Sequence, residues 1–597
     1  REAAIQGTAE VGGAITASTL TTIVVFLPIV YLHGASGALF KDQAWTVAFS
    51  LLASLFVAIL VIPMLFNYAY KGHKQKKEIK SVRIHWYGNA LSKIIDRKGL
   101  VLLLTVIMLA ATALILPKVG SEYLPKSGAG EFSVEVKLQE GTQLERTSRT
   151  IENIESMLTE MLGDQITILY SQIGPSNSGA NEKSVFQNEN TASLKIHLNK
   201  EYIDQSEYII SSIEELLSTI PDAEVSIIRD ETALQSTLGT DEAPLVVEVK
   251  GKDLEVLDQL SSEIKTKLQE ISELYNIKTN IEEGAPEIDV VIDRYKAGIY
   301  NMSVDNIITQ LKDLLMGKEA GKYEKNGEMN DITVKLPDMT LSEFNSIKLK
   351  NGETDVPLYE LAHIEKSVSP KQIFRRNQNR IGKVTADIER SVAFDQVVAK
   401  VRGQIKTVEV PVEYQVEVVG EEQKRQEAMS SLGFALVLSI ILVYMVMASQ
   451  FESLIHPFTI LLTIPLAGVG TVWAFLLLGK PLSMMAYIGV IMLAGIAVND
   501  SIILVDAINQ FKSQGLSLKD SIISAGENRI RPIIMTSLTT ILALLPLTFG
   551  IGESAALRSP MAIAVIAGLI TSTILTLIVI PCVYYVFEKA KDRLFGK

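Results

Sequence analysis

The sequence predicts a polytopic α-helical membrane protein with an external α+β domain of ferredoxin-like (split βαβ) modules and an internal duplication. Three observations predict this fold class. The 597-residue chain contains eight long apolar stretches, and each has the roughly 20 residues that a helix needs to cross a bilayer. A polar and charged region, residues 118–427, separates the third stretch from the fourth. The first two stretches also recur near the C-terminus in nearly the same sequence.

The apolar stretches set the order of the elements. They cover residues 13–32, 44–66, 99–117, 430–448, 455–478, 482–507, 532–551 and 560–587. Between and around these spans we expect a short cytoplasmic lead (1–12), two transmembrane helices (13–67), a basic cytoplasmic segment with an interfacial helix (68–98), one transmembrane helix (99–117), the external domain (118–427), five transmembrane helices (428–587) and a cytoplasmic tail (588–597). The interfacial helix is expected because HWYGNALSKIIDRKG, residues 85–99, mixes apolar and basic residues at helical spacing.

Charge distinguishes the two sides of the membrane. Residues 118–427 hold 35 Lys and Arg against 55 Asp and Glu, whereas the rest of the chain holds 21 against 13. The basic residues outside this region gather at 71–98, at 512–531 and in the C-terminal tail. These three groups fall on one side if the spans alternate, and the positive-inside rule makes that side cytoplasmic. The acidic region is then external, which argues against nucleic acid and anionic head groups as its partners.

The external region is predicted to contain two modules. FSVEVKL, residues 132–138, alternates like a half-buried strand, and the next segments continue in the order β-α-β-β-α-β of a ferredoxin-like sandwich. A second run begins at PLVVEVKG, residues 244–251, and is completed near 380–420. The residues between its halves, about 286–367, are therefore expected to form an insertion with a strand and a helix of its own.

The duplication joins LTTIVVFLP, residues 20–28, to LTTILALLP, residues 538–546, which begin 518 positions later. Four of the identical pairs at this interval are Thr22 and Thr540, Pro28 and Pro546, Gly34 and Gly552, and Pro63 and Pro581. We interpret residues 13–67 and 532–585 as two copies of a helix pair, each closing one repeat. This interpretation predicts a missing N-terminal half of roughly 440 residues ahead of Arg1.

Metal, disulfide and nucleotide sites have little support in the sequence. The single cysteine, Cys582, lies in an apolar span, and the six histidines show no ligand spacing. No phosphate-binding loop is present, so ATP-driven transport and bound cofactors are not expected. Met157 and Met161 share a helix face and could indicate soft-metal export, but a stripe of core residues is the favoured interpretation because no third methionine converges with them.

Four local motifs carry further information: SQFESLIHP (449–457), GIAVNDSIILVD (495–506), RIRPIIMTSLTTILALLPL (529–547) and IDRYKAGIYNMSVDNI (292–307). They accompany a plan of one span, a long external loop of two modules and five further spans. With these motifs and this plan the chain resembles the resistance-nodulation-division (RND) exporters, and within them the hydrophobe/amphiphile efflux pumps. The resemblance implies a pore domain built from the modules, a docking domain built from the insertion, and a homotrimer.

The candidate coupling residues lie in the last membrane spans. Carboxylates inside a span are costly and mark ion or proton paths, which makes Asp500 the main candidate. Asp506 lies nearer the cytoplasmic end, where a solvated carboxylate is the alternative reading. Arg529, Thr536 and Thr540 are spaced to share a helix face, so we expect Arg529 and Asp500 to attract each other. A snorkelling arginine is the alternative for Arg529.

The resemblance adds roles to these positions. In the RND exporters a proton relay pairs two aspartates of the first half with a polar residue, often lysine, of the second half. By motif position Asn499 stands in place of that lysine, and Arg529 and Thr536 match the arginine and threonine of the relay. An asparagine cannot supply the cation that the lysine supplies, so the usual relay scheme requires another arrangement here.

Together these observations predict a proton antiporter rather than an enzyme, located in the bacterial plasma (inner) membrane among its lipids. It would export small amphiphilic or hydrophobic compounds such as drugs, detergents and surfactants, with a periplasmic adaptor and an outer-membrane channel as partners if the host is Gram-negative. A heavy-metal ion exporter of the same architecture is one alternative. A non-transporting protein that assists membrane translocation is the other.

Overall fold

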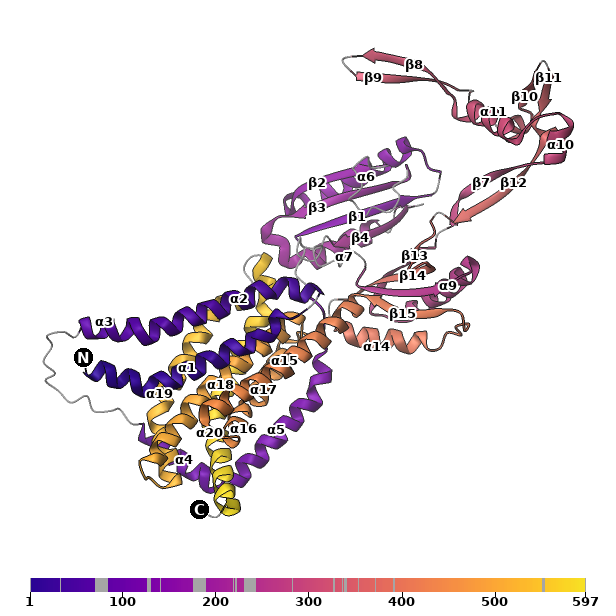
Figure 1. The fold of residues 1–597 in the computed structure, drawn as a ribbon. Helices are drawn as coiled ribbons and strands as arrows, with labels where there is room; N and C mark the ends of the chain where they lie inside the picture. Colours follow the sequence, from indigo (N-terminus) through magenta and orange to yellow (C-terminus); the bar gives the residue numbers. More distant parts are fainter. Residues whose placement is uncertain are drawn as a thin grey trace.

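The structure is a computed structural model that describes residues 2–595 except 33, 70–83, 126–129, 140, 175–188, 218–219, 221–222, 230–242, 282, 326–327, 336, 338–340, 353, 371, 390–391 and 550–552. The basic residues expected between 71 and 83 lie outside the described residues. A helical bundle occupies one end of the molecule, two sheet modules follow it, and an extended arm projects beyond the second module (Figure 1).

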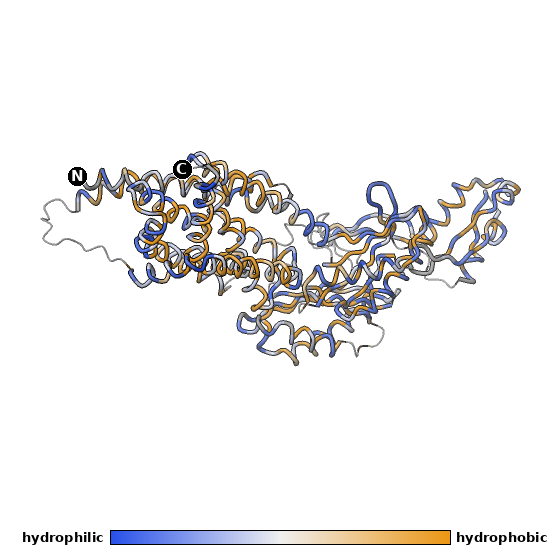
Figure 2. The backbone as a smooth tube through the Cα atoms, turned by 90° about the horizontal axis from the view of Figure 1, so that it is seen from below, coloured by the Kyte–Doolittle hydropathy of each residue, from blue (hydrophilic) through white to orange (hydrophobic). Residues whose placement is uncertain are grey.

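The helical bundle is formed by the two ends of the chain. Its helices are α1 (Glu2–Val30), α2 (Gly34–Phe56), α3 (Ile62–Ala69), α4 (His85–Asp96), α5 (Lys98–Val119), α15 (Glu421–Phe451), α16 (Ile455–Leu461), α17 (Thr463–Leu478), α18 (Met484–Ser513), α19 (Leu518–Thr548) and α20 (Glu553–Phe595), with a π-helical turn (Val57–Val61) between α2 and α3. Figure 2 shows long hydrophobic runs along these helices. In the described residues, seven helical segments are long and apolar enough to cross a membrane.

Two expected spans differ in the structure. The span expected at 13–32 lies in α1, but its apolar part, Ile15–Val30, is shorter than the other seven segments, because the preceding residues are mainly small or polar. The span expected at 532–551 belongs to α19, which begins at Leu518. The polar segment LKDSIISAGENRIR, residues 518–531, extends this helix beyond its apolar part. Because α19 begins at Leu518, Arg529 lies about three turns into its helix.

Helix α18 is the central helix of the bundle. It packs against α1, α15, α17, α19 and α20, and 72% of its most apolar window is buried, more than in any other of the seven segments. The window that covers the end of α2 and α3, by contrast, is not buried at all. A polar side chain on α18 is thus shielded from solvent on most sides.

The first module has the β-α-β-β-α-β element order expected from the sequence. Its elements are β1 (Glu131–Leu138), α6 (Leu144–Leu162), a 3-10 turn (Gly163–Gln165), β2 (Ile166–Ile173), β3 (Thr191–Leu198), a second 3-10 turn (Lys200–Gln205), α7 (Ser206–Leu217) and β4 (Ala223–Arg229). The strands form an antiparallel sheet in the order β2-β3-β1-β4. The alternating side chains Phe132, Val134 and Val136 point from β1 into the core against the two helices.

The second module repeats this plan. Its elements are β5 (Leu245–Gly251), α9 (Leu254–Gln269), β6 (Leu274–Thr279), the short β13 (Arg375–Arg376), β14 (Asn379–Ile388), α14 (Phe394–Ile405) and β15 (Gln415–Gly420). Strands β6, β14, β5 and β15 pair antiparallel in that order. Strand β15 is an edge strand, and α15 of the bundle begins directly after it at Glu421.

The insertion leaves the second module after β6 and returns before β13. Its elements are β7 (Glu283–Ile292), α10 (Arg294–Ile299), α11 (Val304–Met316), β8 (Lys318–Lys325), β9 (Glu328–Val334), α12 (Leu341–Asn345), β10 (Lys348–Asn351), β11 (Thr354–Pro357), α13 (Leu358–Leu361) and β12 (Ala362–Pro370). Strands β7 and β12 pair antiparallel and form the stem of the arm. The expected strand at IDVVID and the expected helix near 304–315 are both present.

The segment that follows α5 joins the bundle to the second module. Ser121 forms a parallel bridge with Leu482, which precedes α18, and the Met484 amide donates to the Tyr123 carbonyl at 3.1 Å. On its other side, the Asp395 amide of α14 donates to the Ser121 carbonyl at 3.3 Å. One short stretch of backbone therefore contacts both the start of α18 and the start of α14.

Candidate coupling site in the membrane helices

The start of α18 is fixed by a capping interaction and its middle by close helix packing. The Ser483 hydroxyl accepts a hydrogen bond from the Ala486 amide at 3.4 Å, as an N-cap residue does. Further along, a Cβ added at Gly489 would meet the Met561 carbonyl of α20 at 2.8 Å, and one added at Gly568 would meet a Leu493 methyl at 2.1 Å. These glycines allow α18 and α20 to approach closely, so that short polar side chains can reach from one helix to the other.

Asp500 lies in the middle of α18 and is only 3% exposed. Its Oδ2 accepts hydrogen bonds from the hydroxyls of Ser537, at 3.0 Å, and Thr573, at 3.4 Å. Its Oδ1 accepts from the Thr536 hydroxyl at 3.3 Å. Ser537 and Thr573 also contact each other, with 2.8 Å between their oxygens. The three donors come from α19 and α20, so three helices meet at one carboxylate.

The neighbouring residue, Asn499, faces a different helix. Its side-chain oxygen accepts a hydrogen bond from the Ser18 hydroxyl of α1. One turn away, the Thr22 hydroxyl reaches the Gly495 carbonyl at 3.4 Å. Asn499 therefore connects α18 to α1, whereas Asp500 connects α18 to α19 and α20.

Arg529 does not lie beside Asp500. The attraction expected between these two residues is therefore corrected by the structure. Within the part of the chain that the structure describes, the Asp500 carboxylate accepts its hydrogen bonds from the hydroxyls of Thr536, Ser537 and Thr573. Arg529 instead lies close enough to Asp506 to act on it electrostatically. The antiparallel packing explains this arrangement, because Arg529 is about 10 Å along α19 from Thr536 and Asp506 is about 9 Å along α18 from Asp500, toward the same end.

Asp506 and Thr540 have local partners. The Asp506 carboxylate accepts a hydrogen bond from Gln510, one turn along the same helix, at 2.8 Å. The Thr540 hydroxyl donates to the Thr536 carbonyl at 3.0 Å, within α19, and the Thr540 residue is half-buried. Of the residues predicted from the sequence, the structure thus brings Thr536 to Asp500, places Arg529 near Asp506, and leaves Thr540 outside both groups.

Three residues of the site were missed by the sequence interpretation: Ser18, Ser537 and Thr573. The signal for two of them was present in the duplication, since STLTT at 18–22 matches TSLTT at 536–540. Both segments are rich in hydroxyl side chains, which is a signal of polar contacts between membrane helices. Thr573 carried no comparable signal, because the hydroxyl residues of its segment TSTILT, residues 571–576, could each bond to their own helix.

A second group of polar residues, the junction cluster, lies where the bundle meets the second module. It consists of Ser121, Asp395, Arg402, Glu422 and Arg425. The buried Glu422 carboxylate accepts from Arg402 at 3.0 Å and from the Nε of Arg425 at 2.8 Å. Arg425 also donates to the Ser121 hydroxyl at 2.8 Å, and that hydroxyl donates to Asp395 at 3.0 Å. The cluster ties α14 and α15 to the segment that pairs with the start of α18.

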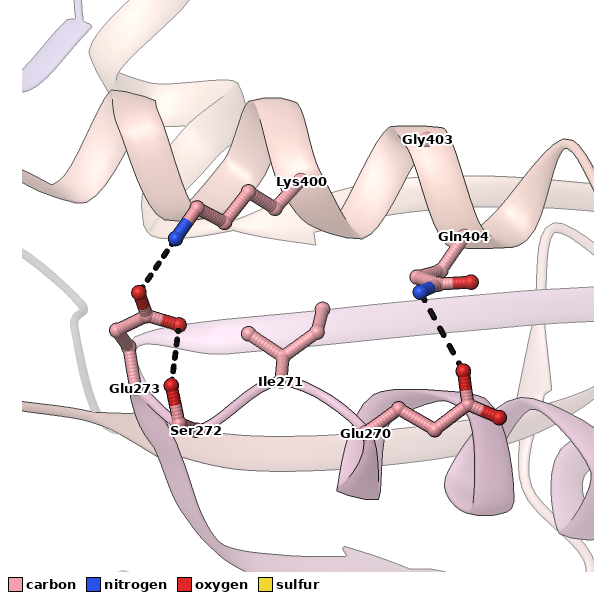
Figure 3. Close-up of a pocket in the computed structure, with 7 residues that line it drawn as sticks. All are labelled: Glu270, Ile271, Ser272, Glu273, Lys400, Gly403 and Gln404. Carbon is pink, nitrogen blue, oxygen red and sulfur yellow. Dashed lines mark hydrogen bonds and ion pairs between the residues drawn. The ribbon is translucent and has the colours of Figure 1, made fainter.

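The second module has a cavity on one side of α14, drawn in Figure 3. It has a volume of about 470 Å³ and is lined by Glu270, Ile271, Ser272, Glu273, Lys400, Gly403 and Gln404. Lys400 donates to Glu273, and Gln404 donates to Glu270 at 3.4 Å. The bond from Lys400 lowers the pKa of the Glu273 carboxyl. Two carboxylates and one ammonium leave this cavity acidic.

Residues 1–588 match the AcrB/AcrD/AcrF family. The chain belongs to this family of RND transporters. The swarming motility protein SwrC of Bacillus subtilis (strain 168) is 26% identical over 608 residues, which cover 98% of this chain and 56% of SwrC. Two crystal forms of a heavy metal efflux pump share the fold, with TM-scores of 0.83 and 0.84 and sequence identities of 22% and 21%.

These relatives are longer than the chain. The matches to the efflux pump structures cover 96% and 98% of this RND chain but 58% and 59% of the pumps. The chain thus spans a little more than half the length of the RND relatives that it matches.

Proposed function

We propose that the complete transporter containing these residues exports amphiphilic or hydrophobic compounds and takes its energy from the proton gradient. The observation that carries this proposal is the Asp500 carboxylate, which is buried among three membrane helices and held by neutral hydroxyls. A carboxylate in such a place marks an ion or proton path. Membership of the RND family supports transport as the activity.

In this proposal a change of charge on Asp500 moves the helices. An ionised carboxylate accepts all three hydroxyl hydrogen bonds, whereas a protonated one also becomes a donor. The bonds to Thr536 and Ser537 therefore have to rearrange when the proton arrives, and α18 shifts against α19 and α20. Two arrangements of one packed element are what a transporter needs to alternate between states.

The remaining architecture is proposed on the same basis. The two β-α-β-β-α-β modules act as ferredoxin-like parts of an external pore domain, and the insertion acts as a docking domain. The duplicated helix pairs close two equivalent halves in a homotrimer of the inner membrane. The acidic external region and the basic groups at the other end of the spans support this orientation. An adaptor and an outer-membrane channel would complete the path in a host with two membranes.

The test is transport by the complete protein in liposomes. An imposed proton gradient should drive movement of a fluorescent amphiphile, and substrate should in turn release protons from the lumen. Two outcomes would contradict a coupling role for Asp500. One is a transport rate that does not depend on the proton gradient, and the other is a normal transport rate in the Asp500→Asn variant.

Export of heavy-metal ions is the second candidate, since two solved structures that share this fold are of a heavy metal efflux pump. Cells that lack the protein should be sensitised to detergents and dyes under the main proposal and to metal ions under this one. A third possibility, assistance of translocation without transport, predicts unchanged accumulation of both kinds of compound.

A further inference from the structure

A second, larger cavity lies on the side of the second module where α14 meets β15 and the start of α15. Its volume is about 770 Å³, within the range of pockets that hold small organic molecules. Its lining residues are Lys250, Arg376, Asn377, Arg402, Ile405, Lys406, Val416, Glu417, Val418, Val419, Gln423 and Gln426.

The lining of this cavity is basic although the external region is acidic. Among the described residues that line it are four cations, on Lys250, Arg376, Arg402 and Lys406, and one carboxylate, on Glu417. Glu417 accepts a hydrogen bond from Lys250 at 2.8 Å and raises the pKa of that lysine, so Lys250 stays charged at neutral pH. The acidic cavity in Figure 3 has the opposite balance, although α14 contributes to both.

The cations differ in how far they are already engaged. Arg376 donates to the buried Glu248 at 2.8 Å, and Arg402 donates to Glu422 at 3.0 Å. Both guanidiniums remain partly exposed, with 44% and 47% of their side chains accessible, and each has further N–H donors. Lys406 is exposed at the end of α14. The cavity therefore offers donors to an anionic group without breaking the existing pairs.

The cavity also has an apolar part. Ile405 of α14 and Val416 and Val418 of β15 are partly buried members of the module core that line it. Cations next to an aliphatic wall suit a molecule with an anionic head and a hydrocarbon body, because the head can accept charge-assisted hydrogen bonds while the body is removed from water.

We propose that this cavity binds anionic amphiphiles, meaning compounds with a carboxylate, sulfate or sulfonate head on an apolar body. This inference rests on the proposed function and narrows the class of compound that the external domain accepts. Arg402 belongs both to the cavity and to the junction cluster. An anion that accepts from the remaining N–H groups of Arg402 shares this guanidinium with Glu422. Occupancy of the cavity would therefore act on the contact between the second module and the bundle.

The test uses the complete transporter in lipid nanodiscs and anilinonaphthalene sulfonate, an anionic amphiphile whose fluorescence rises in apolar sites. Decanoate should displace the probe, and decyltrimethylammonium, with the same chain and a positive head, should not. Gln423→Glu adds a negative charge to the cavity with almost no change in shape, and Lys406→Gln removes a positive one. Each variant should weaken probe binding about tenfold or more.

Two matched controls carry the same chemical changes elsewhere on the module. Gln404→Glu places its charge in the acidic cavity of Figure 3, and Lys252→Gln removes an 84% exposed lysine that faces Glu413. Both should bind the probe as the unmodified protein does. Absence of saturable binding, equal losses in controls and test variants, or displacement by the cation as strong as by decanoate would overturn the proposal.

Asp500→Asn distinguishes this proposal from the proposed function. The variant should bind the probe normally, because the cavity is outside the membrane helices that hold Asp500, while it no longer exports substrate. Normal export by Asp500→Asn would contradict the coupling role of Asp500. The binding of anionic amphiphiles would still be tested by the two cavity variants.

Discussion

Ser18 and Thr536 stand 518 positions apart, at equivalent places in the two matching segments, and they donate hydrogen bonds to adjacent residues of α18. Ser18 donates to Asn499, and Thr536 donates to Asp500. The central helix is therefore held from two sides by hydroxyls at the same place in the two segments, once through a neutral amide and once through a carboxylate. Only the second contact can change with protonation.

Replacing Asp500 by asparagine should abolish export. The amide keeps the shape of the side chain and can still contact the hydroxyls of Ser537 and Thr573, but it cannot exchange a proton. Transport in liposomes should fall about a hundredfold, to background, whereas expression and oligomeric state should stay the same. Asp506→Asn is the matched variant six residues along the same helix, and it should retain most of the activity.

The Ser537 hydroxyl should matter because it contacts both the carboxylate and Thr573. Ser537→Ala should lower the transport rate about tenfold, since it leaves a buried carboxylate with one donor fewer. Ser537→Thr, which keeps the hydroxyl, should restore much of the rate. Thr539→Val is the control, because the Thr539 hydroxyl is exposed and donates only to the Met535 carbonyl of its own helix. Equal effects of Ser537→Ala and Thr539→Val would contradict a specific role.

Arg529 should couple to Asp506 and not to Asp500. A double-mutant cycle for thermal stability with Arg529→Ala and Asp506→Asn should give a coupling energy of about 0.5–1 kcal/mol. The same cycle with Asp500→Asn should give a value near zero, because Arg529 and Asp500 lie at different levels of the bundle. A large coupling between Arg529 and Asp500 would restore the pairing that the sequence suggested.

Glu422 should be the most sensitive residue of the junction cluster. Glu422→Ala removes a buried carboxylate and leaves Arg402 and Arg425 without their shared partner. We expect a loss of about 3–5 kcal/mol, the usual cost of breaking a buried ion pair from one side, measured as a lower unfolding temperature in detergent. Glu413→Ala, which removes a 72% exposed carboxylate beside Lys252, should change the unfolding temperature little.

Gly120 should not accept a side chain. Its φ of +73° lies in the left-handed region, and an added Cβ would meet the Ala393 methyl at 2.4 Å and Asp395 at 2.9 Å. Gly120→Ala should therefore destabilise the protein by about 1–3 kcal/mol. Gly403→Ala is the control in α14, where an added Cβ meets nothing within 4 Å. It should leave stability unchanged or raise it by about 1 kcal/mol.

Much of the candidate site could be predicted from α18 alone. Asp500 could be identified because local composition alone shows a carboxylate inside an apolar span, where burying a charge costs free energy. The partners could not be found in this way. The position of Arg529 along the bundle depends on where α19 begins. The first fourteen residues of this helix, 518–531, are too polar to predict a membrane helix.

The elements of the external modules were easier to predict from the sequence than the contacts between the helices of the bundle. The alternation in β1 and the helical spacing in α6 are local patterns, so the β-α-β-β-α-β order followed from them. The basic cavity was not predicted, because Lys250, Arg376 and Lys406 are far apart in the chain. They meet through the pairing of β14 with β13 and β5, and through the packing of α14. The net charge of residues 118–427 is negative, and this total does not show that the lining of one cavity within the region is positive.

The bridge between Ser121 and Leu482 connects the start of α18 to the backbone after α5, so a tilt of α18 is transmitted to that backbone. Asp500 lies about 24 Å along the helix from Met484, so a tilt of about 5° around Asp500 would carry the start of α18 roughly 2 Å sideways. That distance exceeds the slack of a hydrogen bond. The backbone after α5 must either travel with α18 or release it, and because the same stretch is bonded to the Asp395 amide, travel would turn α14 on the sheet beneath it. A displacement set by one proton would thus reach the second module already enlarged and with a fixed direction.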